Sequence, residues 1–263
     1  MHPYKWMTIG KELKHIEEAQ LDDVKKFFFK YYRPNNAILV IAGNVKTEEV
    51  KKLAEKWFGS IEPGEKNDRN IPQEPKQTAP RQESVKANVP LDAFYKTWHM
   101  PGRNEAGYHA ADVITEILGG GASSRLFQSL VKEKRLFSNI ECYHFGTVDP
   151  GLLTIEGKLI RGVNLEDAEK AVEEELDKLK QSGIEEKELV KVKNRTEAVI
   201  SFEDMNLMNR AGSLAFYEVL GDASLMNSEL QRYHDVSLED ILQESRIIFD
   251  ENNSSTLHYY AKN

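Results

Sequence analysis

Two stretches of the sequence decide the fold: Leu21 to Asn36, LDDVKKFFFKYYRPNN, and Leu238 to Asn253, LEDILQESRIIFDENN. The second stretch begins 217 positions after the first, since 238 minus 21 is 217. The two stretches align without a gap from the opening Leu-acid-Asp-aliphatic residues to the closing Asn-Asn pair. Each stretch has a helical pattern, and a strand pattern follows it, Ala37 to Ala42 in the first and Ser255 to Tyr260 in the second. The same element therefore occurs twice, which indicates a duplicated domain.

Only the second copy has a complete domain body in front of it. That body runs from about residue 85 to residue 236, whereas only twenty residues precede the first copy. We therefore expect this chain to be the C-terminal part of a longer protein, with part of its function encoded upstream of Met1.

The composition limits the classes of function. Hydrophobic residues make up 40% and charged residues 30% of the 263, which is typical of a soluble globular protein. The net charge of −8 disfavours nucleic acid and anionic membranes as partners, because both require a basic surface. No apolar run approaches the ~18 residues of a membrane span, and the single Cys142 excludes a disulfide within one chain. Bacterial cytoplasm and periplasm both stay open as the compartment.

Residues 61–84 are predicted to link two domains. Four prolines stand there among charged and polar residues, which is typical of an extended, solvated and stiff segment. We therefore predict that residues 1–60 are the C-terminal part of a first domain and that residues 85–263 are a complete second domain. The prolines are Pro63, Pro72, Pro75 and Pro80.

Within residues 1–60 the pattern predicts two helices and one strand. Leu21 to Tyr32 has an apolar helical face, and Pro34 ends that helix. Ala37 to Ala42 is continuously apolar, which predicts a strand buried on both faces. A second helix is expected from Thr47, as its N-cap, to Phe58.

Within residues 85–263 the pattern alternates between strands and several consecutive helices. This order predicts an α+β fold in which helices pack on one face of a mixed or antiparallel sheet. Asn164 and Ser237 are expected to cap two of the helices, and Gly183 is expected to close the first of these. The predicted strands are 94–99, 140–145, 152–158 and 255–260, and the predicted helices are 105–118, 125–134, 165–182, 185–201, 205–220 and 238–249.

Seven histidines prompt a search for a metal site, and the sequence contains no complete one. No histidine pairs with another histidine at helical spacing, and neither H-x-x-E-H nor H-E-x-x-H occurs. His109-x-x-Asp112 lacks a third ligand nearby, and a catalytic zinc needs three protein ligands. We therefore predict no catalytic, cofactor-binding or metal-binding residue in this chain. The histidines are His2, His15, His99, His109, His144, His234 and His258.

Four other features have structural interpretations. Gly119 to Arg125 lacks the Gly-Lys-Ser/Thr ending of a phosphate loop, so we interpret it as a helix C-terminus joined to a serine-capped helix, with Arg125 bonding a carbonyl or carboxylate. Phe27 to Tyr32 has the spacing of core aromatics, and Cys142 lies in a strand pattern typical of the core. Glu166 to Lys193 alternates in charge, as a solvated helix surface does.

An ordered series of motifs covers essentially the whole chain. It runs through His2-Pro3-Tyr4-Lys5-Trp6 with Ile9-Gly10, Phe29 to Ala37, Leu39 to Gly43, Trp57-Phe58-Gly59, and Leu118 to Leu126 with Leu130-Val131. As a set, this series resembles the insulinase/pitrilysin-type zinc metallopeptidases, and within them the two-domain, bacterial processing-peptidase-like branch.

The resemblance implies a duplicated-domain, metallohydrolase-like half-shell that encloses a chamber for unfolded peptides. In that family an inverted H-x-x-E-H helix and a distant glutamate hold zinc, and the glutamate of the motif is the general base. Those residues precede the His-Pro-Tyr segment, so the resemblance places the zinc upstream of this chain. It implies a zinc metalloendopeptidase of which this segment, by itself inactive, is the C-terminal portion and packs on the missing N-terminal domain.

One departure from the family pattern bears on partners. Many members carry a substrate-anchoring Arg and Tyr seven residues apart in the second domain, where this chain has Val131 and Ser138. The resemblance therefore implies a homodimer or heterodimer in which a subunit with the Arg–Tyr pair completes the peptide site.

Two further hypotheses remain from the sequence. A catalytically inactive structural or assembly subunit of the same family would have this fold and no zinc motif upstream. An unrelated α+β binding module would be monomeric without an exposed apolar patch, whereas an incomplete first domain would leave helix 21–32 and strand 37–42 poorly covered and promote association.

Overall fold

The computed structural model describes residues 2–5, 10–66 and 70–262, so Trp6 and Ile9 of the family-like series lie outside the described residues. The chain divides into two compact units. One unit comprises Met1–Lys76 and Glu203–Met226, and the other comprises Gln77–Phe202 and Asn227–Asn263. The assignment of a first domain, a linker and a second domain stays a prediction.

The sheet-bearing unit, Gln77–Phe202 with Asn227–Asn263, contains a five-stranded mixed sheet in the order β1-β5-β2-β4-β3. β1 and β5 run parallel, and the other neighbouring pairs are antiparallel, which confirms the predicted mixed sheet. The strands are β1 Arg81–Ala87, β2 Ala93–Met100, β3 Phe137–Phe145, β4 Gly151–Leu159 and β5 Ser254–Ala261.

β1 is absent from the sequence prediction, and its first four residues fall within the stretch predicted as linker. Its sequence RQESVKA is polar, and five of its seven residues are exposed, because it is an edge strand. Such a strand lacks the apolar signal of an inner strand, so its place becomes visible only through its pairing with β5.

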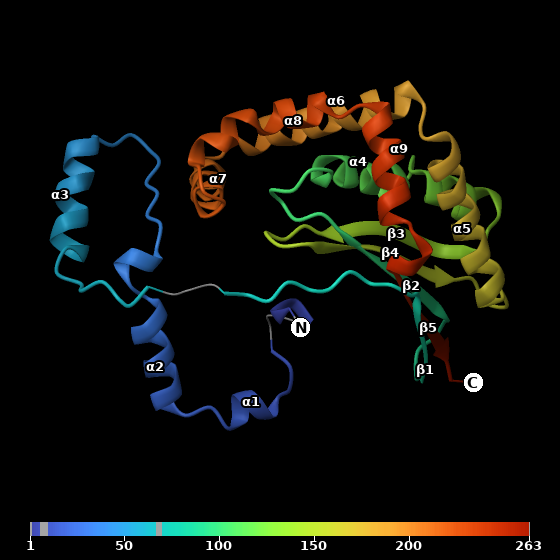
Figure 1. Ribbon diagram of the computed structural model, residues 1–263, viewed down its shortest axis with the longest axis horizontal. Coiled ribbons are helices and arrows are strands. Elements are labelled where there is room, and N and C mark those ends of the chain that lie inside the picture. The colour runs from blue at the N-terminus through green and yellow to red at the C-terminus, as the bar shows by residue number, and fades with distance from the viewer. Residues whose placement is uncertain (1, 6–9, 67–69, 263) are drawn as a thin grey trace. The chain divides into compact units, whose positions relative to one another are not determined.

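Helices cover one face of this sheet, as predicted. Figure 1 shows α4, α5 and α9 together on that face, and each contacts a strand beneath it. Between them lies one core, in which Phe94, Ile114, Ile155, Leu179 and Ile241 are fully buried. The helices of this unit are α4 Tyr108–Gly119, the π-helical segment η3 Phe127–Glu133, α5 Leu165–Ser182, α6 Glu186–Glu203, which ends one residue past the unit boundary, α8 Glu229–Asp235 and α9 Leu238–Ile248.

The predicted helix ends of α5 are confirmed. The Asn164 side chain accepts a hydrogen bond from the Asp167 backbone N–H, which satisfies one of the free donors of the first turn. At the other end Gly183 has φ +67°, a conformation that glycine adopts at little cost.

The other unit, Met1–Lys76 with Glu203–Met226, is helical where it is regular. α2 and α3 confirm two predicted helices, although Lys46, rather than Thr47, occupies the N-cap of α3. None of the described helices is both long and apolar enough to cross a membrane. The helices are η1 Pro3–Lys5, α1 Lys14–Glu17, α2 Leu21–Tyr31, η2 Pro34–Asn36, α3 Thr47–Phe58 and α7 Leu207–Val219, and η4 Ala223–Ser228 crosses the boundary to the sheet-bearing unit.

The predicted strand Ala37–Ala42 is wrong for the structure as described. No described strand pairs with it, and a strand needs a neighbour for its backbone hydrogen bonds. It was also predicted to be buried, yet Ile38, Leu39 and Ile41 are exposed. Phe27, Phe28 and Phe29 of α2 are exposed as well, so their predicted core role is also contradicted here.

The internal repeat extends to single hydrogen bonds. α2 and α9 begin and end 217 positions apart, as do η2 and η5 Glu251–Asn253 (21 and 238, 31 and 248, 34 and 251, 36 and 253). In the first copy the Asn36 side chain donates to the Tyr31 carbonyl at 2.8 Å, and in the second Asn253 donates to Ile248 at 2.9 Å. The two stretches are therefore the same structural element. Among the described residues, only the second is followed by a strand that pairs in a sheet.

Candidate functional site

The histidines of the sheet-bearing unit are used in internal contacts. Each lies against a carboxylate or an amide, and His258 against one of each, whereas a zinc site needs several ligands converging on one point. Among the residues that the structure describes, no group of three or more His, Cys, Asp or Glu could hold a metal ion. These side chains therefore do not fit a zinc site. The pairs are His99 with Asn253, His109 with Glu229, His144 with Asp112, His234 with Glu197 and His258 with Glu169.

His109 and Asp112, the incomplete metal motif of the sequence, point to α8 and β3 instead. His109 Nε2 lies 3.1 Å from Glu229 Oε1, and Asp112 Oδ1 lies 2.7 Å from His144 Nε2. Burial opposes ionisation of Glu229, but the hydrogen bond to His109 and the charge of Arg103 outweigh it and lower the pKa of Glu229 to about 2. Both carboxylates are thus held in the ionised form by their neighbours.

The glycine-rich segment Gly119–Arg125 joins two helices, and α6 holds it in place. Gly119 approaches β3 so closely that a Cβ would come within 2.2 Å of the Cys142 nitrogen. Arg125 makes two hydrogen bonds to Glu188, at 2.8 and 2.7 Å, which confirms its predicted bond to a carboxylate. Burial raises the pKa of the Cys142 thiol, in agreement with its predicted place in the core.

Lys191 of α6 extends this contact, because its Nζ donates to the Ser123 side chain at 3.1 Å. One turn further along, Arg195 donates to the Gly120 carbonyl at 2.9 Å. With Glu188, these residues follow one face of α6. The prediction of a merely solvated charged surface over Glu166–Lys193 is therefore wrong for this face, where the charges bind the glycine-rich segment.

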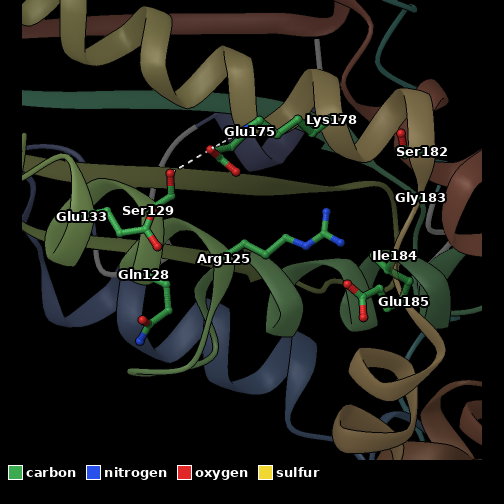
Figure 2. Close-up of a pocket in the computed structure, with 10 residues that line it drawn as sticks. All are labelled: Arg125, Gln128, Ser129, Glu133, Glu175, Lys178, Ser182, Gly183, Ile184 and Glu185. Atoms are coloured by element: carbon green, nitrogen blue, oxygen red, sulfur yellow. Dashed lines mark hydrogen bonds and ion pairs between the residues drawn. The ribbon is translucent and has the colours of Figure 1, made fainter.

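A hollow of about 460 Å³ lies beside this contact. Figure 2 shows the Arg125 side chain extending into the space between the other lining residues, and the hydrogen bond from Ser129 to Glu175, 2.7 Å long. Lys178 also donates to Glu175, so the buried acid already has two partners. The lining residues are Arg125, Gln128, Ser129, Glu133, Glu175, Lys178, Ser182, Gly183, Ile184 and Glu185.

The two positions that depart from the family pattern lie at opposite ends of one turn. Val131 is half-buried in η3, and Ser138 is exposed in β3, where its hydroxyl donates to the Lys158 carbonyl at 3.0 Å. Between them Arg135 has φ +53°, the one positive φ of a non-glycine residue in the described part of the chain. An Arg–Tyr pair is therefore absent from this turn.

An ionic network around the buried Lys96, which the sequence did not reveal, fixes α5 to the sheet. Lys96 Nζ donates to Glu169 at 3.1 Å and to Glu173 at 2.6 Å, and His258 Nε2 lies 2.7 Å from Glu169. Burial opposes the charge of Lys96, but the two carboxylates outweigh it and raise its pKa. Lys96 lies in an otherwise apolar strand pattern, so neighbouring residues alone could not predict its partners.

Comparison with known proteins identifies the family. The family model for the peptidase M16 inactive domain matches residues 18–196. The chain is 29% identical to the zinc protease PqqE of Helicobacter pylori, over 97% of this chain and 58% of that protein. It is also 29% identical to an uncharacterized zinc protease, YmxG, of Bacillus subtilis, over 95% of this chain and 60% of that protein.

A solved structure of a protease from Helicobacter pylori matches with a TM-score of 0.87 and 28% identity, covering 98% of this chain and 63% of that one. The chain thus spans about three-fifths of the length of these relatives. Since the family match covers more than half of the 263 residues, the chain belongs to the peptidase M16 family and carries its inactive domain.

Proposed function

We propose that this chain is the non-catalytic, C-terminal portion of a zinc-dependent metalloendopeptidase that degrades or processes peptides in an enclosed chamber. The observation that carries the proposal is the match to the inactive domain of a family whose matching relatives are named zinc proteases. Because the chain spans only 58% and 60% of those relatives, the zinc and its general base would belong to sequence outside these 263 residues.

The internal repeat supports a further part of the proposal. In the second copy, α9 packs on α4 and α5, and β5 pairs with β1 and β2. The first copy has the same helix and the same asparagine bond, but its apolar residues are exposed. We propose that α2 and Ala37–Ala42 close a first domain built like the second, whose other elements lie outside the described residues.

The proposed role of the second domain is to wall the chamber and to support an extended peptide. β1 and β3 are the two edge strands of its sheet, and an edge strand can bind a peptide through main-chain hydrogen bonds. Because Val131 and Ser138 replace the anchoring Arg and Tyr, that pair would come from a second, non-identical subunit in a heterodimer, since a homodimer would repeat the same two residues.

The test compares residues 1–263 with the protein encoded by the complete source reading frame. Zinc is measured by elemental analysis, and cleavage is measured with a quenched fluorescent peptide, each protein alone and with a co-encoded family member that carries the Arg–Tyr pair. We expect about one zinc per chain in the longer protein, cleavage only when the second subunit is present, and neither property in residues 1–263.

Two outcomes would overturn parts of this proposal. A complete reading frame without H-x-x-E-H would leave a catalytically inactive structural or assembly subunit, and the peptidase assignment would fall. Cleavage by the longer protein as a pure single chain would contradict the requirement for a second subunit.

A further inference from the structure

α8, Glu229–Asp235, is attached to the rest of the sheet-bearing unit in an unusual way. The residues that this helix buries are Glu229 and Tyr233, a carboxylate and a phenol. By contrast, α9 buries Ile241 and Ile248 in the common core. Both side chains that attach α8 thus make polar bonds, and the Tyr233 ring also joins the core.

The Glu229 end of the attachment is a buried ion pair. Glu229 Oε1 accepts from the Arg103 guanidinium and lies 3.1 Å from His109 Nε2, and the side chain of Glu229 is 9% exposed. The Arg103 guanidinium in turn lies 4.7 Å from the centre of the Tyr108 ring. The other oxygen of Glu229, Oε2, is buried and has no hydrogen-bond partner among the described residues. Glu229 therefore contacts both Arg103 and His109 through Oε1.

The Tyr233 end is a chain of hydrogen bonds one helical turn away. The Tyr233 hydroxyl donates to Asp112 Oδ2 at 2.5 Å, and His144 lies 2.7 Å from the other oxygen of Asp112. The rings of Tyr233 and His109 meet edge to face, with their centres 4.8 Å apart. His109 therefore contacts both ends of the attachment.

We propose that α8 is a strap, that Arg103, His109, Asp112, Glu229 and Tyr233 form the clasp that holds it on α4, and that the strap detaches while the sheet, α4, α5 and α9 stay folded. Such a partial opening is expected where a helix has few apolar contacts and depends on a small set of directional bonds. α8 comes shortly after Glu203–Met226 in the chain, and that segment belongs to the other compact unit. Detachment of α8 would therefore release the connection through which the chain returns to the sheet-bearing unit. This device is independent of the proposed peptidase function.

The test is native-state hydrogen exchange of the full 263-residue chain, read by mass spectrometry over a series of urea concentrations below the unfolding transition. In the unaltered protein the free energy of opening is measured for the amides of α8 and of β4 as a function of urea concentration. We expect the slope for α8 to be less than about half the slope for β4, because a local opening exposes less surface. Glu229→Gln should accelerate exchange in α8 by about 100-fold, since it removes the buried carboxylate charge that faces Arg103 and His109. Tyr233→Phe should accelerate it by about 10-fold.

The control is Lys134→Gln, which breaks the exposed ion pair with Glu174 elsewhere in the same unit. It should leave exchange in α8 within about twofold. The same urea dependence for α8 and β4 would show that the strap does not open by itself and would overturn the proposal. If Glu229→Gln does not fold, as judged by near-ultraviolet circular dichroism, the test rests on Tyr233→Phe. Unchanged exchange of the α8 amides in that variant would overturn the proposal that these bonds hold α8 on α4.

Discussion

Replacing Glu244 by glutamine should remove a pH-dependent weakness of the sheet-bearing unit. Glu244 of α9 is 7% exposed, its Oε1 has no hydrogen-bond partner among the described residues, and it lies against Gly107 at the start of α4. Burial without a counter-charge raises the pKa of this carboxyl from 4.5 to about 7. The folded protein therefore retains a proton that the unfolded chain releases.

The sign and size of the effect follow from that difference. Below pH 4.5 both states hold the proton and Glu244 does not oppose folding, whereas between 4.5 and 7 the stability falls as the pH rises. At roughly 1.4 kcal/mol per pH unit, the loss reaches at most about 3 kcal/mol above pH 7. Relaxation of the structure or entry of water at the carboxyl would reduce it. Glutamine cannot ionise, so the variant should lack this dependence.

The assay is urea unfolding between pH 4.5 and 8.5, in a background in which Trp6 and Trp57 are replaced by phenylalanine. It is followed by the fluorescence of Trp98, which is buried against Phe249 in the same unit. The free energy of unfolding of Glu244→Gln minus that of the unaltered protein should increase by about 3 kcal/mol across this range. Glu239→Gln, at an exposed position of the same helix, is the control and should show a nearly constant difference. A difference for Glu244→Gln that stays constant within about 0.5 kcal/mol would refute the reasoning.

Three other changes have defined outcomes. Arg135→Gly should raise the free energy of unfolding by about 0.5–1 kcal/mol, because a non-glycine residue at φ +53° is strained; an unchanged urea midpoint would contradict this. Lys96→Met should lower it by about 3 kcal/mol at pH 7, because Glu169 and Glu173 lose the buried ammonium group from which both accept hydrogen bonds; an unchanged free energy of unfolding would argue against the ionic network. Leu39→Lys should reduce self-association in analytical ultracentrifugation without changing the unfolding seen by Trp98, since it places a charge in an exposed apolar run; unchanged sedimentation would show that this run is not the contact.

Elements with strong local signals were predictable from the sequence. α5 has an apolar stripe, an asparagine at its N-cap and a glycine after its last turn, and each is a short-range preference of the backbone. The repeat was predictable for a related reason, because its caps and its Asn-Asn pair make local bonds, such as that from Asn36 to Tyr31.

Features that depend on distant partners were not predictable. β1 has a polar edge-strand sequence and is defined by β5, which follows it by more than 160 residues. Ala37–Ala42 has a strong strand pattern but has no described partner, so the pattern alone does not form a strand. His109 and Asp112 were recognised as a pair, yet their role depends on Glu229 and Tyr233, more than 100 residues further along.

The position of β5 between β1 and β2 has a consequence for how the protein is made. β5 lies between β1 and β2, and these two strands do not pair with each other. While a ribosome is still producing residues 203–253, β2, β4 and β3 can already pair in that order as a three-stranded antiparallel sheet, but β1 has no neighbour. The sheet-bearing unit therefore completes its sheet only after residues 254–261 have left the exit tunnel, and a nascent chain stalled before that point would expose an unpaired strand edge to chaperones and to other chains.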